Sequence, residues 1–393
     1  MSSDNFANSV MPFVIKATRA HISKGLRNIY VVGSLSSDEA TIIRSECSDR
    51  IYASDIELFV DVGISTFIIC FVRGVAKELS QELTKILGFR GFKTHVSITI
   101  TSFALSRFIP FNRPNSVYLF ELRRTILDAN DYATSPADSL TRPSKLDSLN
   151  LVFSSLADYV FAKLNLIENL TIDEKCYIFA KRCLTLLYSL MLFNELYPRS
   201  YISRIALAKK HHKKLINVLS YSDLEVLEAL TYYKLSGNTV MLTQRLPMNS
   251  RNMNSTLKFL DKYFEELAKK VLMYELADYV YTKKRLKLRK LSGNLPVLLG
   301  KYKSKIKLSF LKRITHLVVH MILTIVCPGE IDWKKLKVIS YSLLTKKLRI
   351  EDLLRYQIGL AFLLMVSRNN KNKLKSVYDI KLMWDSFMMK FAG

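Results

Sequence analysis

The spacing of apolar side chains changes about a third of the way along the chain. In the first part, segments in which apolar and polar residues alternate, as in half-buried strands, stand next to segments whose apolar residues recur every three or four positions, as in amphipathic helices. The pattern predicts helices over 10–24 and 65–87, and strands over 28–32, 55–61 and 93–102. This mixture indicates a small α/β or α+β unit.

From residue 151 nearly to the end, apolar residues keep the helical spacing, and we expect a bundle of about eight helices. Turn-forming residues interrupt this pattern at 197–198, 236–238, 246–247, 292–294 and 327–329.

A stretch rich in Asp, Ser, Thr and Pro separates the two parts, between residues 128 and 150. Such a composition favours turns and loops over packed elements. We therefore predict an α+β chain with a mixed-sheet unit over 1–130, a linker over 131–149 and a large all-α unit over 150–393.

Charge is distributed unevenly between these parts. The chain has 393 residues, of which 49% are hydrophobic, enough for the cores of two or three domains. Its formal net charge is +25, and residues 1–150 hold 17 basic and 15 acidic side chains, a net of +2, which leaves +23 for 151–393. The two parts are therefore expected to face different partners.

A basic tract from Lys283 to Arg313 carries twelve Lys and Arg residues and no acidic residue. Charge of this density binds polyanions through counterion release, whatever their sequence. Nucleic acid, an anionic membrane surface and an anionic glycan are candidate partners, and a solvated basic face is the simpler alternative. The candidate polyanion-binding residues are Lys283, Lys284, Arg285, Lys287, Arg289, Lys290, Lys301, Lys303, Lys305 and Lys307.

The five cysteines form no C-x-x-C pair, so neither a disulfide framework nor a zinc site is expected. The first residues lack the basic and apolar regions of a signal peptide. The longest apolar runs, 184–193 and 316–327, fall short of the roughly twenty residues of a membrane span. These observations predict a cytoplasmic protein without a transmembrane segment.

The most specific chemical signal joins two of the predicted strands. Gly33 and Ser34 follow the first strand, where a turn can present backbone N–H groups to a phosphate. Asp55 and Glu57 lie two residues apart on the next strand, so both carboxylates project from one face. Two like charges that close need a cation between them, and carboxylate oxygens suit Mg²⁺ or Mn²⁺. A phosphate site beside a metal site indicates a nucleotide.

The order of a strand, Gly33-Ser34, a helix and a strand carrying Asp55-x-Glu57 resembles the polymerase-β-like nucleotidyltransferase superfamily. The resemblance implies a nucleotidyltransferase-like sheet domain followed by a helical domain that shapes the acceptor site. It also implies that Asp55 and Glu57 are catalytic and hold Mg²⁺ or Mn²⁺, while Gly33 and Ser34 hold a nucleoside triphosphate. An acceptor hydroxyl on a sugar, small molecule or protein would attack the α-phosphate with loss of pyrophosphate.

A narrower resemblance is to nucleotidyltransferase-like proteins associated with glycan-biosynthesis gene clusters. It includes Glu39, five residues after the serine, and the segments 179–181 and 198–204 of the helical part. The resemblance covers about residues 28 to 204, and it adds Glu39 to the implied nucleotide-binding residues.

The chain departs from the superfamily at the third carboxylate that active members usually carry on a later strand. The matching strand here has Ser97 and Thr99, and neutral hydroxyls are poor Mg²⁺ ligands. This loss should impair activation of the attacking hydroxyl more than binding of the triphosphate. Asp61 lies on the same predicted face as Asp55, but at about 20 Å along an extended strand it is too far to share an ion.

Three classes of function therefore stay open: a metal-dependent nucleotidyltransferase, a catalytically degenerate nucleotide-binding protein, and a polyanion-binding helical protein with a vestigial domain. Simpler roles are also open for the site residues. Asp55 and Glu57 could lie on an exposed strand edge, Ser34 could cap a helix, and Glu39 could favour a helix dipole from its first turn.

Overall fold

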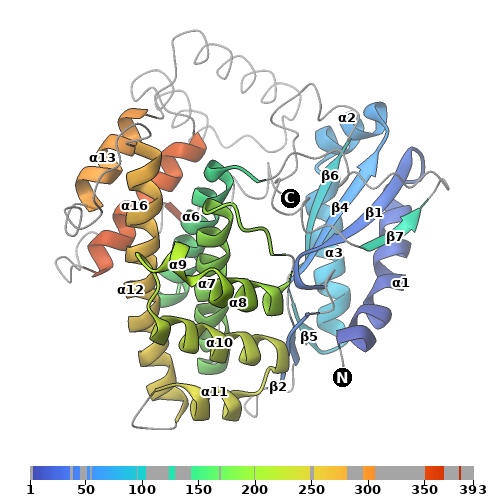
Figure 1. Ribbon diagram of the computed structural model, residues 1–393. Coiled ribbons are helices and arrows are strands. Elements are labelled where there is room, and N and C mark those ends of the chain that lie inside the picture. Colours follow the sequence, from blue (N-terminus) through green and yellow to red (C-terminus); the bar gives the residue numbers. More distant parts are fainter. Residues whose placement is uncertain are drawn as a thin grey trace.

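A sheet-containing half and a helical half stand side by side in the computed structural model (Figure 1). In this view the helical half lies to the left of the sheet, and α1 (Ser3–His21) lies to its right. The structure describes residues 3–35, 39–44, 51–53, 55–94, 96–102, 124–128, 143–167, 170–198, 200–247, 252–280, 295–305, 350–366 and 380–381.

Four strands form the larger sheet, in the order β6-β4-β1-β7. The central strand β1 (Leu26–Val32) is antiparallel to both of its neighbours, β4 (Ile56–Val62) and β7 (Arg124–Asp128). The edge strand β6 (Val96–Thr101) runs parallel to β4. The expectation of an α+β chain whose first half contains a mixed sheet is confirmed.

A smaller sheet joins β2 (Ile42–Arg44), β3 (Ile51–Ala53) and β5 (Phe92–Lys93), in the order β2-β3-β5. The strand predicted over 93–102 is therefore two strands, because β5 and β6 belong to different sheets. The strands predicted over 28–32 and 55–61 are confirmed as β1 and β4.

Alternation along β4 gives the larger sheet one apolar and one more polar face. Ile56, Leu58 and Val60 are buried in the core of this half, together with residues of α1 and α3 (Val75–Phe89). Because successive side chains of a strand point to opposite faces, Glu57 and Asp61 lie on the other side of the sheet. The acidic residues are thus kept away from the apolar core.

The single helix predicted over 65–87 is wrong. The structure has α2 (Ile64–Arg73) followed by α3, and Gly74 between them adopts a left-handed conformation with φ of 67°. Glycine reaches this conformation without the steric cost that other residues meet, so the chain changes direction there. The apolar spacing alone continues through Gly74 and does not reveal the break.

Helices make up the described part of the second half. They are α6 (Lys145–Lys163), α7 (Ile172–Phe193), α8 (Tyr201–Lys210), α9 (His212–Leu215), α10 (Tyr221–Ser236), α11 (Thr239–Arg245), α12 (Met253–Val280), α13 (Leu295–Lys305) and α16 (Ile350–Val366).

Local capping explains several of these boundaries. Ser144 and Asp147 form a capping box that starts α6 inside the stretch predicted as linker, 131–149. Gly237, with φ of 65°, ends α10, and the side chain of Asn238 caps α11, which confirms the predicted break at 236–238. The breaks predicted at 292–294 and 327–329 lie outside the described residues.

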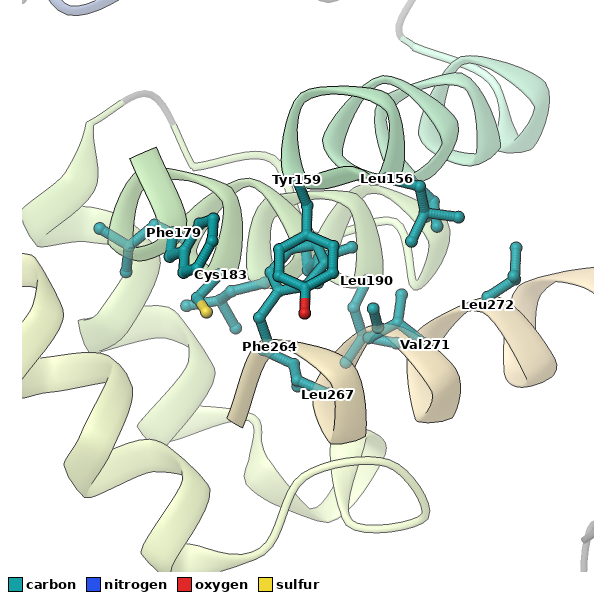
Figure 2. Close-up of a cluster of buried hydrophobic side chains, with 14 of the residues drawn as sticks. Leu156, Tyr159, Phe179, Cys183, Leu190, Phe264, Leu267, Val271 and Leu272 are labelled. Carbon is teal, nitrogen blue, oxygen red and sulfur yellow. The ribbon is translucent and has the colours of Figure 1, made fainter. Parts of the chain in front are cut away.

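The core of the helical half lies where α6, α7 and α12 meet (Figure 2). The ring of Tyr159 lies between Phe179 and Phe264, with centroid distances of 4.9 and 4.2 Å. Among the described helices, α7 is long and apolar enough to cross a membrane by length and composition, which the shorter apolar runs of the sequence did not indicate. Of its most apolar window, 83% is buried inside the protein, as in the core helix of a soluble protein.

Candidate functional site

The turn after β1 lies directly against β4. The register of the two strands places Val32 opposite Glu57, and Gly33 follows with φ of +69°, in the region that favours glycine. A Cβ at Gly33 would lie 2.5 Å from Glu57 Oε2. Both the backbone conformation and the closeness of this carboxylate therefore require glycine here.

Asp55 completes a cluster at this end of the sheet. It directly precedes β4, which begins one residue later than predicted, and its side chain is 30% exposed. The structure thus brings together Gly33, Asp55 and Glu57, which the sequence had placed in one site. Ser34 lies in a 3₁₀ turn of three residues, η1 (Gly33–Leu35), where the sequence predicted the start of a helix.

Lys181 of α7 brings one positive charge to the two adjacent carboxylates. Its Nζ lies 2.6 Å from Asp55 Oδ2, and its side chain is 17% exposed. Burial disfavours the charged ammonium, but attraction to Asp55, and more weakly to Glu57, outweighs this, so the pKa of Lys181 lies well above its ordinary value. The ion pair joins residues 126 positions apart and links the two halves.

Glu39 also links the halves. Its carboxylate is buried and accepts hydrogen bonds from the backbone N–H groups of Tyr201, at 2.9 Å, and Ile202, at 3.4 Å. These groups belong to the first turn of α8, where backbone donors lack partners within the helix and a negative charge favours the dipole. The simpler interpretation of Glu39 was that it favours the dipole of its own helix from the first turn. In the structure it favours the dipole of α8, a helix of the other half. Its role in nucleotide binding stays a prediction.

Lys234 of α10 lies at the same junction and is 1% exposed. Its ammonium donates to the Glu39 carbonyl oxygen at 3.4 Å and to the hydroxyl of Thr41. The rings of Tyr177 and Tyr201 lie 5.3 and 5.2 Å from its Nζ, within the range of cation–π attraction. Buried polar contacts thus fix the helical half against the segment that follows the Gly33 turn.

The position of the expected third carboxylate is visible in the sheet. Ser97 of β6 is the partner of Glu57, and Thr99 is the partner of Phe59. Asp61 is buried and lies four residues further along β4, between Asn28 and Thr101. Within the part of the chain that the structure describes, no group of three or more His, Cys, Asp or Glu residues is arranged to hold a metal ion. Two carboxylates and Lys181 therefore form the described site.

Most of the basic tract, 283–313, lies outside the described residues. The exceptions in α13 include Lys301, which is exposed, and Lys303, which is half-buried with its Nζ 5.1 Å from the ring centroid of Tyr356. Polyanion binding by the tract stays a prediction.

Sequence reasoning missed the parts played by Lys181 and Lys234. Lys181 was included only as part of segment 179–181, which carries the narrower resemblance, although the sequence held a more specific signal. From residue 176 to the end of α7, Lys181 and Arg182 are the only charged side chains in an otherwise apolar helix. Because lysine is almost never buried unless it is paired, such a position indicates an acidic partner elsewhere in the chain.

Compared with protein-family models, curated proteins and solved structures, the chain has no match.

Proposed function

We propose that the protein binds a nucleoside triphosphate with Mg²⁺ or Mn²⁺ at the end of β1 and β4, in a nucleotidyltransferase-like site. One observation carries this proposal: the Gly33 turn and the carboxylates of Asp55 and Glu57 lie together, with Glu57 Oε2 2.5 Å from the position of a Cβ at Gly33. A triphosphate and its metal ion have to meet in such an arrangement. The succession of β1, the Gly33 turn and the neighbouring strand β4, with Asp55 directly before β4 and Glu57 within it, supports the nucleotidyltransferase-like fold.

The chemistry that suits this site is phosphoryl transfer. Asp55 and Glu57 offer hard oxygen ligands, and Mg²⁺ bound to one or two carboxylates completes its shell with water and substrate phosphates. In nucleotidyl transfer, an acceptor oxygen forms a bond to the α-phosphorus while the bond to the pyrophosphate oxygen breaks, and the hydroxyl proton is lost to solvent or base. A metal ion held by Asp55 and Glu57 would neutralise charge on the phosphates.

Ser97 beside Glu57 points to inefficient transfer. A second metal ion that activates the acceptor hydroxyl needs carboxylate ligands, and the described site offers two. Nucleotide binding is accordingly the main function that we propose, with transfer slow or restricted to one acceptor. A cytoplasmic location accompanies this proposal.

Ligand-dependent stabilisation tests nucleotide binding. A ligand that binds only the native state stabilises it by about 2.7 kcal/mol at a concentration of 100 Kd. The Tm of the protein should therefore rise with Mg²⁺ and NTP together, and Asp55→Asn with Glu57→Gln should abolish the rise. Each variant is compared with its own unliganded state, because Asp55→Asn also removes the partner of Lys181.

The matched control is Glu78→Gln with Glu82→Gln, which also removes two acidic side chains. Both belong to α3, the helix that covers the apolar face of the sheet, away from the site. This variant should keep the full ligand-dependent shift. A shift that persists in the Asp55/Glu57 variant would show that the nucleotide binds elsewhere.

Transfer is tested by restoring a carboxylate with Ser97→Asp. Since residue 97 is the partner of Glu57, the new carboxylate would lie beside the site, and release of pyrophosphate from NTP should increase. Ser97→Asn adds similar volume without charge and should have no such effect. Fast turnover by the unaltered protein would contradict the inference that a missing carboxylate limits transfer.

A further inference from the structure

Lys181 reaches the candidate site from the other half of the protein. Its ammonium lies 2.6 Å from the carboxylate of Asp55, and the carboxylate of Glu57 also attracts it. An ion pair could serve only to hold the halves together, but a second pair already does this away from the site. Lys93 of β5 lies 2.8 Å from Glu174 in the first turn of α7. The two pairs allow the role of Lys181 in the site to be separated from a purely structural one.

The charge of the three described groups favours one metal ion over two. The carboxylates of Asp55 and Glu57 with the ammonium of Lys181 carry one net negative charge. One divalent ion changes this to one net positive charge, which attracts a polyphosphate. A second divalent ion would add two further charges without a further carboxylate among the described residues to bind it.

We infer that Lys181 is a positioning residue that acts as a fixed cation at Asp55, so that the site takes one divalent metal ion and Lys181 supplies the remaining positive charge that holds the metal–nucleotide complex. This inference rests on the proposed nucleotide binding. It adds that the helical half contributes one positive charge to the site. Without this charge, the two carboxylates would favour binding of a second divalent ion.

The inference predicts effects of opposite sign on two ligands. Lys181 repels a bare divalent ion, but it attracts a Mg²⁺–NTP complex, which is negatively charged. Removing the ammonium should therefore strengthen binding of Mn²⁺ alone and weaken binding of Mg²⁺–NTP. Each change should be about tenfold, on the order of the interaction of one unit charge with a doubly charged ligand several ångströms away in water.

The experiment uses the full chain with Lys181→Met, which keeps the length of the side chain without its charge. Lys181→Gln is the second variant, because its amide can still donate a hydrogen bond to Asp55 and supports folding. Mn²⁺ binding is followed by electron paramagnetic resonance, and Mg²⁺–NTP binding by calorimetry. Lys93→Met is the control: it removes another described ion pair between the halves, away from the site, and should leave both affinities unchanged.

The wild-type protein should bind one Mn²⁺ at the site, and both Lys181 variants should show the two opposite changes. If both Mn²⁺ and Mg²⁺–NTP bind more weakly to the variants, the Lys181–Asp55 pair is merely structural and the inference is overturned. If both ligands bind more tightly to the variants, Lys181 only competes with the metal ion for Asp55, and the inference is also overturned. Mg²⁺–NTP binding that depends on Asp55 and Glu57 but is unchanged in the Lys181 variants refutes this inference alone, whereas its absence from the wild-type protein refutes the proposed function as well.

Discussion

Glu275 should make the stability of the helical half depend on pH. This residue of α12 is fully buried, and its two carboxylate oxygens accept hydrogen bonds from Ser189 Oγ at 2.6 Å and Ser148 Oγ at 2.7 Å. Burial raises the pKa of Glu275 from 4.5 to about 8, although both hydroxyls lower it by favouring the charged form. At neutral pH the folded protein therefore keeps this carboxyl group protonated.

The sign and size follow from proton linkage. Between pH 4.5 and about 8 the unfolded chain has lost this proton while the folded chain keeps it, so the free energy of unfolding falls as the pH rises. One pKa unit corresponds to about 1.4 kcal/mol, which gives a total loss of up to about 5 kcal/mol. Above pH 8 both states are ionised, and the contribution of Glu275 becomes constant.

Glu275→Gln should remove this dependence, because the amide is neutral at every pH and nearly the same shape. Urea unfolding is measured for both proteins from pH 5 to pH 9, and the difference in their free energies of unfolding is plotted against pH. The variant should gain on the wild type by several kcal/mol between these limits. Glu266→Gln, at a 59% exposed position of the same helix, should show a difference within about 0.5 kcal/mol throughout. A difference for Glu275→Gln that stays constant from pH 5 to pH 8 would refute the reasoning.

Three further predictions concern the site, the junction and the basic tract. Gly91→Ala, which has φ of +83° and no neighbouring atom within 4 Å of its Cβ, should cost about 1 kcal/mol of stability without affecting the ligand. Gly33→Ala should cost more than this, because its Cβ would also displace the Glu57 carboxylate, and it should abolish the nucleotide-dependent rise in Tm. Glu39→Ala should lower the free energy of unfolding in urea by about 1–2 kcal/mol and let the halves unfold in separate steps; Ser200→Ala, which removes the cap of α8 within the helical half, should lower stability without that separation. Replacing the four alternating lysines of 301–307 by Gln should flatten the salt dependence of DNA or RNA binding by up to about four charges, and an unchanged slope would exclude the tract from that binding.

The sequence was sufficient for features set by neighbouring residues. Alternation predicted β1 and β4, and the two-residue spacing of Asp55 and Glu57 was enough to expect two carboxylates close together. Turn chemistry predicted the break at Gly237, because a left-handed residue and an N-cap follow each other there. In each case the deciding interactions lie within a few positions of one another.

Features set by distant contacts could not be read in the same way. Lys181 and Asp55 are 126 positions apart, so no local spacing links them, and the partner of Glu39 is a helix start 162 positions away. The sequence indicated that the two carboxylates need positive charge nearby, but the part that Lys181 supplies depends on how the helical half packs against the sheet. The prediction of one helix through Gly74 was wrong for a different reason. Glycine is tolerated within helices, and only its backbone conformation shows that a helix ends here.

The difference in charge between the halves reappears at their junction. Asp55 and Glu39 of the nearly neutral first half meet Lys181, Lys234 and the positive end of α8 from the strongly basic second half. Because Asp55 would bind both Lys181 and the proposed metal ion, any ligand that changes the charge at Asp55 also changes the attraction between the halves. By linkage, formation of the Lys181–Asp55 pair must then alter the affinity for that ligand by the same factor. Nucleotide binding and this particular contact between the halves are therefore expected to be a single coupled equilibrium, to which pairs away from Asp55, such as Lys93 with Glu174, do not belong.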